Sequence, residues 1–184
     1  MKTNRVDTRA MCKTALCAAL LCVSSYISIP LPFTTVPITG QTIAVNLVAL
    51  LLTPVQAAIA LGVYILLGAV GLPVFAGGSG GIGSLVGPAG GYIFGFFIAA
   101  VLIALLKGKR PNLIRYLIVT ICVGIPVIDL CGMASLMLVS KLTLASAFMG
   151  GAVPFLATDI VKCVAASLIA VALEKALRKI PAAA

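Results

Sequence analysis

The chain has 184 residues, of which 62% are hydrophobic and only 9% are charged. A soluble domain carries about 25% charged residues. The composition therefore predicts an integral membrane protein with one transmembrane domain over residues 1–184 and no attached soluble domain. The net charge of +9 comes mostly from three short clusters of Lys and Arg, a pattern typical of loops beside a membrane rather than of nucleic-acid binding.

The first apolar span is predicted from about residue 10 to about residue 29, behind a basic N-terminal segment. It has no clear small-residue cleavage site, so we expect a retained helix rather than a signal peptide. Ala15 and Ala19 are four residues apart, which lets another helix approach closely. This face fits packing within the protein or docking to a different membrane protein.

Residues 30–42 contain three prolines and a glycine, which exclude a continuous helix. The segment has no charge, yet it contains apolar side chains such as Phe33. We therefore expect a loop folded onto the protein at the membrane face, where it could act as a lid. Gln41 is its most versatile hydrogen-bonding side chain, since an amide both donates and accepts.

Two apolar runs, residues 43–52 and 55–72, flank Thr53-Pro54 and predict a helical hairpin with a minimal turn. Asn46 is a polar residue inside this hairpin. It fits either a hydrogen bond to a neighbouring helix or contact with a ligand.

Residues 71–95 are rich in glycine but free of charge, unlike a soluble linker. Backbone without side chains can pass close to a ligand and offer its amides. The nucleotide-binding loop Gly-x-x-x-x-Gly-Lys-Ser/Thr is absent from the sequence. Gly90-Gly91-Tyr92 begins a predicted fourth span that ends at about residue 106.

The fifth span is predicted over residues 113–139, with a kink at Gly124-Ile-Pro126. Asp129 follows the kink in apolar sequence, where it fits a protonated or hydrogen-bonded structural acid or a functional one. Residues 140–149 are predicted to form a loop, and the sixth span begins near Pro154.

Asp159 and Lys162 stand three residues apart near the start of the sixth span, so on a helix they share one face. Each charge would cost about 2.5–3.5 kcal/mol near the middle of a bilayer, which indicates a ligand, an ion path or a buried structural pair. Lys162 suits a carboxylate, and Asp159 accepts hydrogen bonds from N–H groups. The expected ligand is small and mostly apolar, with walls formed by Phe33, Phe75, Tyr92 and Phe155.

Six spans make this an all-α membrane protein with both termini and the loop at 107–111 on one side. That side holds all of the 13 basic residues except Lys141 and Lys162, so we expect it to be cytoplasmic. The proline-rich segment, the glycine-rich segment and the loop before the sixth span then converge on Asp159 and Lys162 at the outer face.

Three segments together resemble the BioY family, the biotin-specific S components of energy-coupling factor (ECF) transporters. They are residues 36–42 (VPITGQT), 87–96 (GPAGGYIFGF) and 154–162 (PFLATDIVK), and the likeness extends over essentially the whole chain. The resemblance implies the S-component fold and high-affinity biotin capture at the outer face of a prokaryotic plasma membrane. It implies that Asp159 meets the ureido ring and that Lys162 meets the valerate carboxylate.

The resemblance also implies further substrate-binding residues and partners. We expect the remaining substrate-binding residues to be Gln41, Ser79, Gly90, Gly91 and Tyr92. The partners are a transmembrane coupling protein, docked at Ala15 and Ala19, and two cytoplasmic ATPase subunits, because nothing in this chain suggests ATP hydrolysis. We expect no catalytic residue, cofactor or metal: the sequence has no histidine and no Cys-x-x-Cys.

The sequence departs from the family pattern at several positions. Ala157-Thr158 replaces a common Pro-Gly before the aspartate, and Gly40 replaces a usual large aliphatic residue. Asp129 stands where an uncharged residue is expected. In the family, a polar amide side chain from the glycine-rich segment often contacts the ureido ring. No such amide is evident here, and the candidates to take its place are Gly78, Ser79 and Ser84. These departures concern affinity, lid packing and selectivity.

Two alternatives are kept beside biotin capture. One is an S component for another small apolar carboxylate such as lipoate. The other is an intramembrane aspartic protease that uses Asp129 and Asp159. Neither acid stands in a Tyr-Asp or Gly-x-Gly-Asp context, and Lys162 beside Asp159 does not fit two acids that share a proton.

Overall fold

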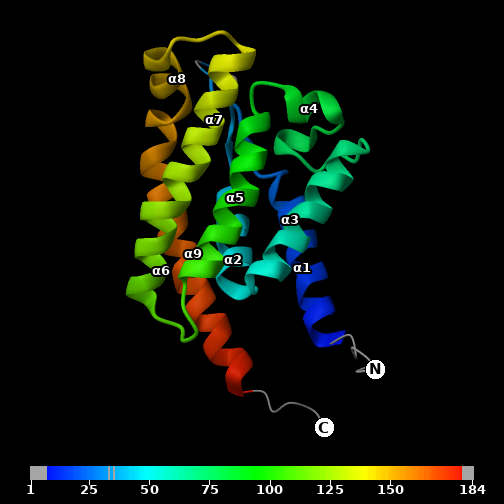
Figure 1. Ribbon diagram of the computed structural model, residues 1–184, viewed down its shortest axis with the longest axis vertical. Helices are drawn as coiled ribbons and strands as arrows, with labels where there is room; N and C mark the ends of the chain where they lie inside the picture. The colour runs from blue at the N-terminus through cyan, green and yellow to red at the C-terminus, as the bar shows by residue number, and fades with distance from the viewer. Residues whose placement is uncertain (1–7, 33, 35, 180–184) are drawn as a thin grey trace.

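The computed structural model describes residues 8–32, 34 and 36–179, and these residues are mostly helical (Figure 1). They form the α-helices α1 (Thr8–Ser24), α2 (Gln41–Leu51), α3 (Pro54–Ala69), α4 (Ile82–Val86), α5 (Gly90–Leu106), α6 (Leu113–Val119), α7 (Ile125–Val139), α8 (Leu144–Gly151) and α9 (Val153–Lys179). Four shorter elements are the strands β1 (Ser28–Ile29) and β2 (Ile38–Thr39), the 3-10 helix η1 (Ala76–Gly78) and the π-helical turn η2 (Thr120–Gly124). The prediction of a mainly helical chain is confirmed.

Two helical segments of the described chain, Leu113–Val139 and Val153–Leu177, are long and apolar enough to cross a membrane by length and composition. Three further apolar helices, α2, α3 and α5, are shorter. Figure 1 shows that α1 begins, α5 joins α6 and α9 ends at the same end of the molecule. The opposite end holds α4, α8 and the end of α7.

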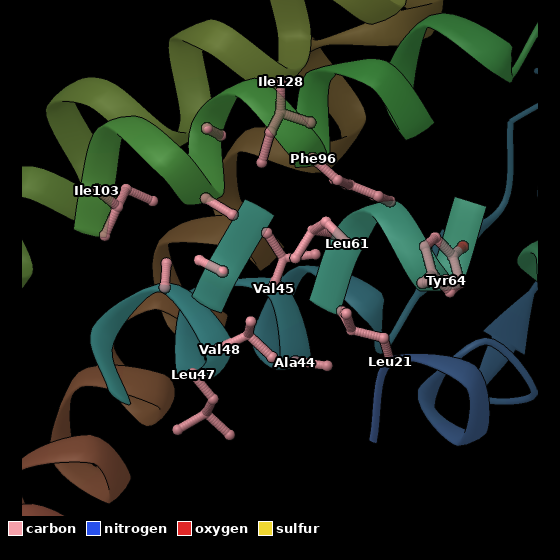
Figure 2. Packing of buried hydrophobic residues seen from close by; sticks show 14 of the residues in the cluster. Leu21, Ala44, Val45, Leu47, Val48, Leu61, Tyr64, Phe96, Ile103 and Ile128 are labelled. Atoms are coloured by element: carbon pink, nitrogen blue, oxygen red, sulfur yellow. The ribbon is translucent and has the colours of Figure 1, made fainter. Parts of the chain in front are cut away.

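The hydrophobic core is built around α2, which lies between α9, α5 and α1. Val45 and Val48 are completely buried, because α2 is enclosed by other helices rather than set at the surface. In Figure 2 their side chains gather with Leu61 of α3, while Phe96 and Ile103 of α5 lie above them. This packing holds the start of α2, and therefore Gln41, at a fixed place between α3 and α5.

The α2–α3 turn is short, as the sequence predicts, and the side chains of Thr53 and Gln56 cap the start of α3. The Thr53 hydroxyl accepts a hydrogen bond from the Gln56 backbone N–H, and the Gln56 side chain accepts one from the Thr53 N–H. Pro54 occupies the first turn of α3, where a missing N–H does no harm. The predicted helical hairpin is confirmed.

The proline-rich segment folds back onto the protein, as the sequence predicts. Strands β1 and β2 pair antiparallel, with Ser28 opposite Thr39. The Gly40 N–H donates to the Ile27 carbonyl at 2.8 Å, and the Gly77 N–H donates to the Ser25 carbonyl at 3.0 Å. The first bond joins the proline-rich segment to the residues that follow α1, and the second joins those residues to the glycine-rich segment.

The prediction of a loop over residues 140–149 is wrong, because Leu144–Gly151 form helix α8. The Thr143 hydroxyl accepts a hydrogen bond from the Ser146 N–H and caps the helix. Leu, Ala and Met are good helix formers, and with this cap they outweigh the two glycines at the end of the segment.

The predicted interruption of the fifth span is present as a π-helical turn. Residues Thr120–Gly124 form η2, and Pro126 lies in the first turn of α7. A proline within a helix removes one backbone hydrogen bond and crowds the preceding turn, so a local change of helical geometry relieves the conflict.

Candidate ligand-binding site

A cavity of about 250 Å³ lies where the start of α9 meets α7, the start of α5, the glycine-rich segment and residues 36–42. Pockets for small molecules commonly measure about 300–1,000 Å³, so this cavity suits a small ligand. Its polar and ionisable lining comes mainly from Thr39, Gln41, Thr42, Ser79, Ser84, Asp129, Asp159 and Lys162. Its apolar lining includes Val36, Phe75, Tyr92, Ile93, Phe96, Ile128 and Phe155.

Asp159 and Lys162 face the cavity together because both lie on one face of α9 in its second and third turns. Lys162 Nζ donates to Asp159 Oδ1 at 2.9 Å. The Lys162 side chain is only 13% exposed, and the Asp159 side chain is 8% exposed. An ammonium has three donors, and this bond uses one of them, so the pair retains capacity for a polar ligand.

Gln41 is buried at the first position of α2. Its amide nitrogen donates to the Tyr64 hydroxyl at 2.6 Å. The Tyr64 ring meets the Phe75 ring edge to face, with centroids 5.4 Å apart. This chain of contacts holds Gln41 at the cavity wall and connects it to the aromatic side of the pocket.

Tyr92 presents its ring to the cavity, whereas its hydroxyl bonds elsewhere. The hydroxyl donates to the Gly151 carbonyl at 2.7 Å and so ties α5 to the end of α8. Gly132 on α7 makes room for the ring, since a side chain there would overlap it. Phe155 lies beside the ring at a centroid distance of 6.4 Å. Tyr92 is therefore an apolar wall held in place by polar and packing contacts.

Gly90 and Gly91 do not line the cavity. A Cβ on Gly90 would overlap the Leu85 carbonyl of α4, and a Cβ on Gly91 would overlap the Cys131 carbonyl of α7. Both glycines let α5 approach its neighbours closely, and they thereby set the position of Tyr92.

Ser79 and Ser84 line the cavity from the glycine-rich segment. The Ser79 hydroxyl donates to the Ala76 carbonyl at 3.0 Å, and the Ser84 hydroxyl donates to the Gly80 carbonyl at 3.1 Å. Each hydroxyl oxygen can still accept a hydrogen bond. Gly78 has φ +76° and turns the chain before Ser79 without lining the cavity itself.

Four other residues that the sequence singles out lie apart from the cavity or outside the described residues. Asn46 is buried, and its amide contacts Cys163 Sγ of α9 at 3.4 Å, so the interpretation as a bond to a neighbouring helix is confirmed. Ala15 and Ala19 are exposed on α1. Phe33 lies outside the described residues.

Sequence reasoning left the role of Asp129 open and did not select Ile93, Phe96 and Ile128. All four residues line the cavity. Phe96 follows Tyr92 by four residues on α5, so helical spacing is the signal that could have found it. Ile128 and Asp129 follow the π-helical turn, which changes the face that later residues present, so their direction could not be read from spacing alone.

Comparisons with known proteins agree with one another. The model of the BioY family matches residues 1–179. The biotin transporter BioY of Thermotoga maritima is 40% identical over 167 residues, which cover 91% of this chain and 96% of that protein. The probable biotin transporter BioY of Pyrococcus horikoshii is 41% identical over 160 residues, which cover 87% of this chain and 93% of that protein.

A crystal structure gives the same result in three dimensions. It is that of the S-component for biotin from an ECF-type ABC transporter, and it matches with a TM-score of 0.87 and 28% sequence identity over 95% of each chain. The family model, the two relatives and the matched crystal structure each cover nearly the whole chain. The chain therefore belongs to the BioY family.

Proposed function

We propose that this protein is the biotin-specific S component of an ECF-type transporter and that it captures biotin with high affinity for uptake. The observation that carries the proposal is the Asp159–Lys162 ion pair, which lines a small and largely apolar cavity. The likeness to an S-component for biotin supports the same ligand.

The chemistry of biotin matches the polar and apolar parts of this cavity. Asp159 would accept hydrogen bonds from the ureido N–H groups, and Lys162 would bind the valerate carboxylate. The rings and the aliphatic chain would pack against aromatic walls such as Phe75, Tyr92 and Phe155. Gln41 and Ser79 would complete the polar contacts, while Gly90 and Gly91 would act through the placement of α5.

We infer six membrane spans, formed by α1, α2, α3, α5, the continuous unit from α6 to α7, and α9. Both termini would be cytoplasmic in the plasma membrane of a prokaryote. Figure 1 supports this arrangement, because α1 begins and α9 ends at the end of the molecule where the basic α5–α6 connection lies. The cavity would then open to the exterior, with the proline-rich segment as its lid.

The partners would be a transmembrane coupling protein and two cytoplasmic ATPase subunits. The likeness to a component of an ECF-type ABC transporter supports this assembly. Ala15 and Ala19 are exposed on one face of α1, where small side chains allow a second helix to approach. We assign this face to the coupling protein.

Equilibrium binding of labelled biotin to the purified, ligand-free protein in detergent tests the proposal. We expect saturable nanomolar binding that unlabelled lipoate, thiamine and riboflavin do not displace. Lipoate has a carboxylate but no N–H groups, so it would leave the Asp159 carboxylate without a donor from the ligand. Displacement by lipoate at similar concentration would favour the broader carboxylate specificity, and a folded protein without biotin binding would overturn the proposal.

Replacement of Asp159 or Lys162 by Ala tests the site assignment. Each variant should remain folded and lose tight binding, since truncation of one partner in a desolvated charged contact typically costs about 2–5 kcal/mol. Nanomolar binding retained by both variants would place the ligand elsewhere.

A further inference from the structure

The cavity holds a third ionisable side chain that the ion pair does not use. Asp129 of α7 is 7% exposed and lines the cavity together with Asp159 and Lys162. Within the described part of the chain, its carboxyl forms no hydrogen bond or ion pair with another side chain. Lys162 is bonded to Asp159 rather than to Asp129.

Among the described residues, no side-chain donor is bonded to Asp129 in this arrangement. Tyr92 of α5 is near it, but the Tyr92 hydroxyl donates to the Gly151 carbonyl. Asp159 of α9 is near enough to interact with it as a second acid. Helix α8 packs on α7 and contains no titratable side chain, and the thiol of Cys122 in η2 is exposed rather than part of the cavity lining.

Charge balance distinguishes the two protonation states of Asp129. The cavity lining contains one ammonium and two carboxyl groups. If both carboxyl groups are ionised, the empty cavity carries a net charge of about −1, and an entering carboxylate ligand would make it about −2. An unmatched buried charge is strongly unfavourable, and such a group usually becomes neutral instead. A proton on Asp129 reduces the excess negative charge by one, to about zero in the empty cavity and to about −1 with the ligand bound.

We propose that Asp129 is protonated in the ligand-bound protein, so that binding of a carboxylate ligand takes up about one proton from solution. The inference rests on the proposed function, with biotin as the ligand. A neutral carboxylic acid also supplies a donor that a carboxylate lacks. Protonated Asp129 could therefore donate to the ureido carbonyl oxygen, while Asp159 accepts from the ureido N–H groups.

Calorimetric titration with biotin in buffers of different ionisation enthalpy counts the protons directly. The series covers about pH 6 to about pH 10. We expect uptake to approach one proton over part of this range, where the dissociation constant should rise about tenfold per pH unit. In Asp129→Asn, uptake should fall to near zero and the dissociation constant should lose this pH dependence. Zero uptake by the wild-type protein at every pH, or undiminished uptake by the variant, would overturn the inference.

A second ligand keeps the test independent of how well the variant folds. Biotinamide has the ureido ring of biotin but an uncharged end to its chain. It should drive less proton uptake than biotin in the wild-type protein, because it adds no negative charge to the cavity. Equal uptake with the two ligands would contradict the charge argument. Absence of biotin binding at every pH would instead reject the proposed function, so the two failures are distinguishable.

Discussion

Lysine side chains are buried or half-buried in apolar surroundings at two ends of this molecule, and they differ in what their donors contact. At the end near the start of α6, Lys107 Nζ donates to the Leu50 and Leu52 carbonyls at 2.5 and 2.6 Å. Lys13 Nζ donates to the Leu51 carbonyl at 2.6 Å. At the other end, Lys162 has one bond to Asp159 and faces a cavity.

The unpaired carbonyls at the end of α2 explain why lysines are needed there. The helix has 11 residues and is therefore about 16 Å long, so in the proposed arrangement it would cross the bilayer only together with the residues before Gln41. The last carbonyls of a helix have no partner within it, and lipid supplies none. Positive charge is also favourable at a helix C-terminus. Lys13 and Lys107 thus have a structural role there, whereas Lys162 has donors available to a ligand.

The largest predicted effect is on ligand affinity at the cavity. Lys162→Met keeps the length of the side chain and removes its charge, so biotin affinity should fall by about 2–5 kcal/mol. Equilibrium binding measures the loss, and helix content by circular dichroism confirms the fold. Affinity within threefold of the wild type would contradict the assignment of Lys162 to the carboxylate.

A Lys-to-Met substitution at the other end of the molecule should change stability rather than biotin affinity. Lys107→Met should lower the free energy of unfolding by about 1.5–3 kcal/mol, because the α2 carbonyls lose a charged donor. Biotin affinity should stay near the wild-type value. The exposed Lys175 provides a matched control, and its change to Met should shift stability by no more than about 0.5 kcal/mol. Thermal unfolding followed by circular dichroism compares the three proteins, and equal stability of the two variants would remove the structural role of Lys107.

Two glycine substitutions, one beside the cavity and one away from it, test whether close packing holds the cavity wall in place. Gly132→Ala would push into the Tyr92 ring and should destabilise the fold by about 1–3 kcal/mol, with weaker biotin binding because the cavity wall moves. Gly62 of α3 is the control, since a Cβ there meets open space. Gly62→Ala should stabilise the helix by about 0.5–1 kcal/mol. A Gly132→Ala protein with wild-type melting and binding would show that the ring moves aside without consequence.

The smallest predicted effect concerns a helix cap remote from the ligand. Thr53→Ala removes the side-chain acceptor at the start of α3 and should lower the free energy of unfolding by about 1 kcal/mol. Biotin affinity should not change. Thermal unfolding and biotin titration of the same sample separate these two quantities, and a loss of affinity would mean that the α2–α3 turn is coupled to the cavity.

Several elements could be predicted from sequence because local chemistry determines them. Helix α5 begins at Gly90, and α9 begins one residue before Pro154, as expected from glycine breaks and a proline in the first helical turn. Helix α8 was missed because the glycines at 150–151 are also typical of a loop, and Thr143 as its cap is a weak signal in isolation.

The site could be predicted only where one helix determines the geometry. Asp159 and Lys162 are three residues apart on α9, so their common face follows from helical spacing. Gly90 and Gly91 show the limit, because sequence does not tell whether a glycine approaches a ligand or a neighbouring helix. The direction of Asp129 depends on the π-helical turn before it, which only the folded chain reveals.

The central claim is that Lys162 recognises the ligand carboxylate, and a double cycle of protein and ligand changes tests it most directly. The four dissociation constants are those of wild type and Lys162→Met with biotin and with biotinamide, all at one pH. We predict that the substitution weakens biotin by a large part of about 2–5 kcal/mol but weakens biotinamide far less. Equal losses for the two ligands would mean that Lys162 supports the cavity without contacting the carboxylate, and would contradict the account.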